Sequence, residues 1–232
     1  STSSSYYGTF ALDVTELDAM VRVVRALGDH PFVHGFKLGF SMGLTHGLPR
    51  AVEAIRAHSD KPVIYDHQKA ATDIPATGAL FARVMAHAGI DEVILFPQAG
   101  PVTLRAWIEA LHEQGRKVIV GGAMTHPGYL DREGGFLLDA APERMYGIAR
   151  EAGVRAFVMP LTKPDVAQAA ALAAGLEPDM EYYSPGYGSQ GGDPARFPFF
   201  QRHHVIVGRA LLGADDPAAW VDAQRALLEA IV

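Results

Sequence analysis

The sequence predicts a single-domain (β/α)8 barrel, the α/β fold in which parallel strands and helices alternate along the chain. Short apolar runs rich in Val, Ile and Phe alternate with amphipathic stretches of helical period throughout the 232 residues. Eight such units recur at a spacing of roughly 25–30 residues, which is typical of this barrel. No shift in composition marks a linker, so we expect residues 8–232 to form one domain behind a disordered or tag-like tail at residues 1–7.

Each expected strand is a short apolar run bounded by turn residues, and each is followed by a helix except the seventh, which is followed by a glycine-rich loop. We expect strands at residues 9–14, 32–40, 62–66, 92–96, 117–120, 156–160, 181–185 and 204–209. We expect helices at residues 17–27, 48–57, 80–88, 102–114, 142–152, 164–176 and 218–231, the first with Thr15 as its N-cap. Strict alternation predicts parallel pairing, because a chain that returns to a parallel strand needs a crossover segment.

The composition argues against several classes of protein. A net charge of −6 does not favour general nucleic-acid binding, which needs a basic face. The chain has no cysteine, and therefore neither a disulfide framework nor thiolate chemistry. No apolar run reaches the ~18 residues of a membrane span, and the first residues lack the pattern of a signal peptide. We expect a cytoplasmic protein that binds neither nucleic acid nor membrane.

Three ionisable residues, Asp66, Lys69 and Asp73, stand within eight residues at the end of the third expected strand. A buried strand end is a costly place for charges unless they neutralise one another. Two carboxylates around one lysine, without cysteine and without the spacing of metal ligands, indicate a built charge array. The alternative is a solvated loop with ordinary ion pairs.

Other polar residues follow other strands, and the carboxyl ends of the strands are where such barrels carry their chemistry. The residues at or just beyond strand ends are Asp13, Lys37, Asp66, Lys69, Thr125, Gln190 and Arg209. We expect them to converge on one mouth of the barrel. The ten histidines show no spacing typical of metal ligands, and we interpret them as structural.

A glycine-rich loop follows the seventh strand, and a Gly-Arg pair ends the eighth. The loop reads Ser184-Pro185-Gly186-Tyr187-Gly188-Ser189-Gln190-Gly191-Gly192-Asp193. Glycines let backbone N–H groups approach an anion closely, and the loops after strands seven and eight are the usual phosphate site of the fold. Arg209 can hold a phosphate with two parallel hydrogen bonds. A phosphate site is therefore favoured over a merely flexible loop.

Motifs along nearly the whole chain resemble those of the orotidine 5'-monophosphate decarboxylase family. The most discriminating are the glycine-rich loop at residues 184–193 and Val207-Gly208-Arg209. The others are Ala11-Leu12-Asp13, Phe36-Lys37-Leu38-Gly39, Asp66 and Lys69 with Asp73-Ile74-Pro75-x-Thr77, Thr125-His126-Pro127-Gly128, and Met159-Pro160-x-Thr162-x-Pro164.

The resemblance implies cofactor-independent decarboxylation of orotidine 5'-monophosphate to uridine 5'-monophosphate in pyrimidine biosynthesis, by a homodimer with shared sites and without a metal. Lys37, Asp66, Lys69 and Asp73 resemble the family's catalytic charge tetrad, whose last aspartate reaches into the neighbouring subunit's site. Lys69 would stabilise the carbanion at C6 of the pyrimidine and then protonate it. The implied substrate contacts are Asp13, Lys37, Ile74, Thr77, Thr125, Pro160, Gln190, Gly208 and Arg209.

One segment departs from the family pattern. The family spacing is D-x-K-x-x-D, whereas residues 66–73 read D-x-x-K-x-x-x-D, so the tetrad requires that the added residues bulge out. Two other functions stay open. One is a magnesium-dependent sugar-phosphate lyase or decarboxylase of the hexulose-phosphate synthase type, for which an acid would be expected where Lys37 stands. The other is a barrel that binds a phosphorylated ligand without catalysis.

Overall fold

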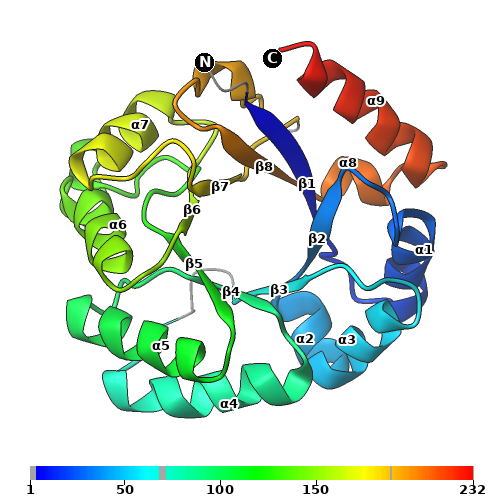
Figure 1. Ribbon diagram of the computed structural model, residues 1–232, viewed down its shortest axis with the longest axis horizontal. Coiled ribbons are helices and arrows are strands. Elements are labelled where there is room, and N and C mark those ends of the chain that lie inside the picture. Colours follow the sequence, from blue (N-terminus) through cyan, green and yellow to red (C-terminus); the bar gives the residue numbers. More distant parts are fainter. Residues whose placement is uncertain (1–3, 68–71, 189, 232) are drawn as a thin grey trace.

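Eight parallel strands close into a barrel surrounded by helices (Figure 1). The computed structural model describes residues 4–67, 72–188 and 190–231. Each strand pairs with the next one in sequence, and the last closes on the first. The strands are β1 (Ser5–Ala11), β2 (Val33–Leu38), β3 (Val63–Asp66), β4 (Glu92–Leu95), β5 (Lys117–Gly121), β6 (Ala156–Val158), β7 (Glu181–Ser184) and β8 (Arg202–Val207). The predicted (β/α)8 barrel is confirmed.

The helices form the outer layer, because a chain that returns to the start of the next parallel strand needs a crossover segment, and α1 to α7 lie in these crossovers. They are α1 (Leu17–Leu27), α2 (Phe40–His46), α3 (Leu48–Arg56), α4 (Gly78–Ala88), α5 (Pro101–Glu113), α6 (Ala141–Glu151), α7 (Pro164–Ala173), α8 (Arg209–Leu212) and α9 (Pro217–Glu229). Short 3-10 turns are η1 (Pro75–Thr77), η2 (Asp131–Glu133) and η3 (Pro194–Arg196). No helix in the described ranges is long and apolar enough to cross a membrane.

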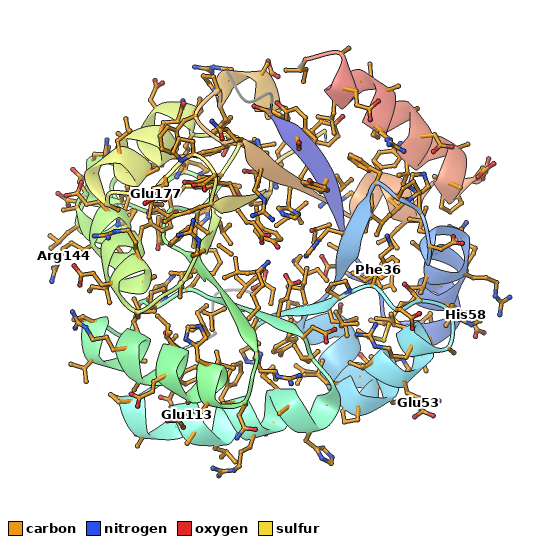
Figure 2. All side chains as sticks on the ribbon, in the orientation of Figure 1. Phe36, Glu53, His58, Glu113, Arg144 and Glu177 are labelled. Carbon is orange, nitrogen blue, oxygen red and sulfur yellow. The ribbon has the colours of Figure 1, made fainter. Side chains whose placement is uncertain are left out.

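Side chains that alternate along the strands make two cores. Those pointing outward pack under the helices, as Phe10, Phe36 and Tyr65 do. Those pointing inward fill the centre of the barrel (Figure 2), where a layer of branched residues includes Ile64 and Ile119. This inner apolar layer separates the polar residues at the two ends of the barrel, as expected of a packed barrel rather than a pore.

The structure corrects several expected boundaries. β1 begins at Ser5, inside the expected tail, because residues 5–7 pair with residues 202–204 of β8. The same strand ends at Ala11 rather than at residue 14. Glu16, not Thr15, is the N-cap of α1, and no side chain caps it. Helices α2 and α8 were not predicted, since each is too short to show a periodic apolar face.

Candidate active site

A buried ion pair stands inside the carboxyl end of the barrel. Lys37 comes near the end of β2 and Asp66 ends β3, and Nζ of the lysine lies 3.2 Å from Oδ2 of the aspartate. The two residues are 6% and 3% exposed. Both point inward because Lys37 pairs with Ile64, and Asp66 follows Ile64 by two positions on the same face of β3. Burial of these charges is tolerated because each offsets the desolvation of the other.

The chain that follows Asp66 carries the rest of the predicted tetrad. Lys69 lies outside the described residues. Asp73 and Ile74 face solvent in the single chain, Ile74 being 57% exposed. The hydroxyl of Thr77 donates to Oδ2 of Asp73 at 3.3 Å, and this bond joins the aspartate to η1. The side chains of Asp73 and Ile74 are therefore accessible at the surface of the single chain.

Thr125 and Pro160 belong to two loops that are hydrogen-bonded to each other. Thr125 follows β5, and its carbonyl oxygen accepts a bond of 2.9 Å from the hydroxyl of Thr162. Lys163, next in sequence, donates to the carbonyl of His126 at 2.7 Å and to Glu133 at 2.9 Å. The hydrogen bond from Lys163 lowers the pKa of the Glu133 carboxyl. Pro160 is buried where β6 ends. The loops after β5 and β6 thus form one connected rim.

The glycine-rich loop after β7 is held close to the rim. Gly186 has φ +101°, a conformation that favours glycine, and its carbonyl accepts from the amide of Gly192 at 2.9 Å. An added Cβ at Gly192 would lie closer than 3.0 Å to Cβ of Leu161. Glycine is therefore required for this close approach. Gln190 is exposed on the loop, and Ser189 lies outside the described residues.

The ends of β1 and β8 complete the rim. Gly208 follows β8 and lies against Ala11, so that an added Cβ would stand 3.1 Å from both the Cβ and the carbonyl oxygen of Ala11. Arg209 and Asp13 are both exposed just beyond these adjacent strands. The exposed side chains of Asp13, Gln190 and Arg209 thus follow β1, β7 and β8, which are neighbours in the barrel.

Some contacts at the mouth were not predicted. Tyr65 and His67 share a hydrogen bond outside the barrel, and Nε1 of Trp107 donates to the carbonyl of Ile74 at 3.0 Å. Phe96 follows β4 and fills the space above Gly121, where an added Cβ would lie closer than 3.0 Å to the ring. The inward position of a glycine in β5 was the one available signal in the sequence, and it does not reveal which side chain fills the space.

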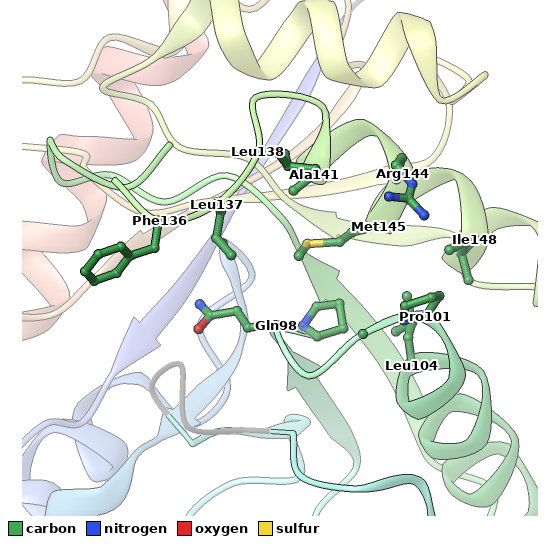
Figure 3. Close-up of a pocket in the computed structure, with 12 residues that line it drawn as sticks. Gln98, Pro101, Leu104, Phe136, Leu137, Leu138, Ala141, Arg144, Met145 and Ile148 are labelled. Carbon is green, nitrogen blue, oxygen red and sulfur yellow. The ribbon is translucent and has the colours of Figure 1, made fainter. Parts of the chain in front are cut away.

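Two cavities flank the mouth rather than fill it. The one in Figure 3, of about 230 Å³, lies between α5 and α6 and is lined by none of the predicted site residues. The other, of about 380 Å³, is lined by Asp73 and Thr77 together with apolar residues of α4 and by Trp107 of α5. Among residues 4–67, 72–188 and 190–231 there is no group of three or more His, Asp or Glu side chains that could hold a metal ion.

The chain is thus a (β/α)8 barrel whose buried ion pair and polar rim both lie at the carboxyl ends of the strands. This is the face that carries the active site in enzymes of this architecture. A family model described as orotidine 5'-phosphate decarboxylase / HUMPS family matches residues 9–223. The chain belongs to this family, which confirms the resemblance inferred from its motifs.

Individual relatives agree with this placement. The orotidine 5'-phosphate decarboxylase of Methanosarcina mazei is 33% identical over 207 residues, which cover 89% of this chain and 88% of the relative. That of Methanococcoides burtonii is 32% identical, with 90% of both chains covered. A crystal structure of the Methanocaldococcus jannaschii orotidine 5'-monophosphate decarboxylase complexed with inhibitor BMP has a TM-score of 0.82 and 26% identity, and the match covers 96% of this chain and 98% of that one.

Proposed function

We propose that this protein decarboxylates orotidine 5'-monophosphate to uridine 5'-monophosphate, the carboxy-lyase step of pyrimidine biosynthesis. The observation that carries the proposal is the buried Lys37–Asp66 pair inside the carboxyl end of the barrel. A lysine beside the acid at the end of β3 suits a charge array, whereas a magnesium site would need a further carboxylate there. The curated relatives named above support the same assignment.

The reaction needs fixed charges more than it needs reactive groups. Loss of CO₂ from C6 leaves a carbanion in the plane of the pyrimidine ring, where the π-system cannot spread the charge. Preorganised cations and hydrogen bonds are the means by which a protein stabilises such a charge. In the proposed mechanism Lys69 stabilises the carbanion and then protonates C6. Asp66 of the same chain and the partner's Asp73 keep Lys69 charged and in place.

The remaining rim residues are assigned to the nucleotide. Asp13 binds a ribose hydroxyl, and Lys37 bridges the ribose and Asp66. Thr125 and Pro160 hold the pyrimidine side, and Gln190 spans pyrimidine and phosphate. The Gly208 backbone and Arg209 bind the phosphate. The exposure of Asp13, Gln190 and Arg209 at the ends of neighbouring strands supports these assignments, because a ligand at the mouth could reach all three.

The functional unit in this proposal is a homodimer. Asp73, Ile74 and Thr77 act in the partner's site, and the exposure of Asp73 and Ile74 in the single chain supports this. Large apolar side chains are exposed around the same region, among them Ile74, Leu80 and Val84 at 57%, 57% and 47%. Large apolar side chains that are exposed in one region of the chain are more often covered by a partner than left in water.

One assay separates the alternatives. Purified protein is given orotidine 5'-monophosphate with a chelator, and loss of substrate absorbance is followed. Full turnover is expected in the chelator. A metal requirement would indicate the magnesium-dependent class, and binding of the nucleotide without turnover would indicate a non-catalytic barrel.

Variants of the tetrad test the mechanism and the dimer together. Lys69→Ala should fold and bind uridine 5'-monophosphate, yet lose nearly all turnover. Asp73→Ala should also be inactive. Mixed dimers of the two variants should regain some activity, because one of their two sites has both side chains intact. Wild-type turnover in Lys69→Ala would remove this lysine from the mechanism, and mixtures without recovery would argue against shared sites.

A further inference from the structure

The chain that leaves β3 is clamped on the outside of the barrel. The Tyr65 hydroxyl and Nδ1 of His67 are hydrogen-bonded, and the two ring centroids lie 5.5 Å apart. Alternate residues of a strand point to the same face, so this bond continues the strand pattern past the end of β3 at Asp66. Asp66, between the two aromatic residues, consequently points inward to Lys37.

Tyr65 is well suited to be the donor of this bond. It is buried in the outer core, and burial together with the nearby Asp66 raises the pKa of its hydroxyl to about 12. The hydroxyl therefore keeps its proton at neutral pH. A buried hydroxyl without a hydrogen-bond partner destabilises the fold, so the bond favours one position for His67.

The bond between Tyr65 and His67 is a first anchor of this segment. Two further hydrogen bonds, one on each side of Asp73, form a second anchor. Nε1 of Trp107, on α5, donates to the carbonyl of Ile74 at 3.0 Å. The Thr72 hydroxyl donates to the carbonyl of Phe96 at 3.1 Å, just beyond β4. Trp107 is itself fixed, since it is buried and its ring packs on Phe81 with centroids 4.7 Å apart.

The cavity of about 380 Å³ lies beside both anchors. Tyr65, His67, Asp73, Thr77 and Trp107 all line it. The anchors therefore attach both flanks of the longer D-x-x-K-x-x-x-D stretch to rigid elements, at β3 on one side and at β4 and α5 on the other. The attachment points on both sides therefore do not depend on the number of residues between them.

We propose that Tyr65, His67 and Trp107 are positioning residues that fix the two flanks of the segment carrying Lys69 and Asp73, and so allow the longer spacing to serve the same reaction. The inference rests on the proposed function for its catalytic effect and on the hydrogen bonds for its structural effect. It assigns His67 a place outside the substrate pocket, because its Nδ1 is bonded to the outward-facing Tyr65.

Substitutions of the first anchor give a specific pattern. Tyr65→Phe keeps the ring and removes the donor, and His67→Ala removes the acceptor. Each should lower kcat about 10- to 100-fold, since a displacement of about 1 Å at a reacting group costs on the order of 100-fold. KM for orotidine 5'-monophosphate should stay within about 3-fold, because the phosphate contacts proposed for Gln190 and Arg209 come from other strands.

Rescue and coupling distinguish positioning from general damage. His67→Asn places an amide group near the position of Nδ1 and should restore kcat to within about 3-fold of the parent. The double variant Tyr65→Phe/His67→Ala should be no slower than either single variant, because both remove the same bond. Tyr182→Phe is the matched control, since it removes a buried hydroxyl that donates to the carbonyl of Glu177 at 2.5 Å near the amino ends of the strands. Its kcat should equal that of the parent.

Amide hydrogen exchange tests the anchors without reference to turnover. Peptides containing Asp66 and His67 should exchange faster in Tyr65→Phe, and those containing Ile74 faster in Trp107→Phe, with Tyr182→Phe unchanged at both. Unchanged exchange, an unaltered kcat in Tyr65→Phe, or a His67→Asn variant as slow as His67→Ala would overturn the proposal. If the parent does not decarboxylate the nucleotide but exchange rises as expected, the proposed function fails while the anchoring stands.

Discussion

Two buried histidines in β8 should make this protein sensitive to mild acid. His203 points outward beneath Phe200 and shares a 2.7 Å hydrogen bond between its Nε2 and the Ser184 hydroxyl. His204 points inward and stacks on Tyr183 with ring centroids 4.1 Å apart. Neither ring nitrogen of His204 has a hydrogen-bond partner within the described part of the chain. Burial lowers the pKa of His203 to about 3 and that of His204 well below its usual range.

The sign and size of the effect follow from proton linkage. A base whose pKa is lower in the folded state binds its proton mainly in the unfolded state, so it stabilises the fold above its unfolded pKa and this stabilisation is lost as the pH falls. At pH 5, one such histidine with an unfolded pKa near 6.5 lowers the free energy of unfolding by about 2 kcal/mol, from RT ln(1 + 10^1.5). Two such histidines together lower it by about 4 kcal/mol, which is a large part of the ~5–15 kcal/mol stability of a typical domain.

Charged neighbours of His204 act in the same direction. His34, Lys117, His203 and Arg202 all disfavour a further positive charge there, as lesser causes than burial. Glu92, at the same end of the barrel, has its own pKa lowered by hydrogen bonds from His34 and Tyr183 and by Lys117, against the opposing effect of burial. That carboxylate adds stability that is lost only at lower pH, below its unfolded pKa of about 4.5.

Urea unfolding at pH 5, 6 and 7.5, at one fixed protein concentration, measures this dependence. The free energy of unfolding should fall with acidification, and His204→Phe should reduce the fall between pH 7.5 and pH 5 by about 2 kcal/mol, the contribution of one histidine. Phenylalanine keeps the stack on Tyr183. His87→Gln, which removes an exposed imidazole from α4, is the control and should show the same fall as the parent. An unchanged fall in His204→Phe would refute the reasoning.

Two further predictions concern the packing and the hydrogen bonds of the rim. Gly121→Ala places a Cβ closer than 3.0 Å to the buried ring of Phe96 and should lower the free energy of unfolding, measured in urea, by about 1–3 kcal/mol. Adding Phe96→Leu should restore part of this stability, because it removes the ring. A Gly121→Ala variant as stable as the parent would contradict the prediction. Thr162→Val removes the donor to the Thr125 carbonyl and should raise KM for orotidine 5'-monophosphate about 2- to 10-fold, whereas Thr162→Ser should not. Equal KM values for the two Thr162 variants would show that this bond does not position the loop.

Much of the fold could be predicted because its signals are local. The period of apolar residues distinguishes strands from helices, and strict alternation of the two requires parallel pairing. The inward direction of Lys37 and Asp66 also follows from alternation along neighbouring strands. Boundaries were less predictable, since the pairing of residues 5–7 with β8 depends on a strand almost 200 residues away.

By itself, the sequence determined the order of the elements and the family to which the chain belongs, because both are carried by residue type and spacing along the chain. Only the tertiary structure decided which groups touch. The bond from Trp107 to Ile74, the bond from Thr162 to Thr125 and the contact between Phe96 and Gly121 each join separate units of the barrel. Such contacts depend on how neighbouring helices and loops pack, and packing is settled only when the barrel closes.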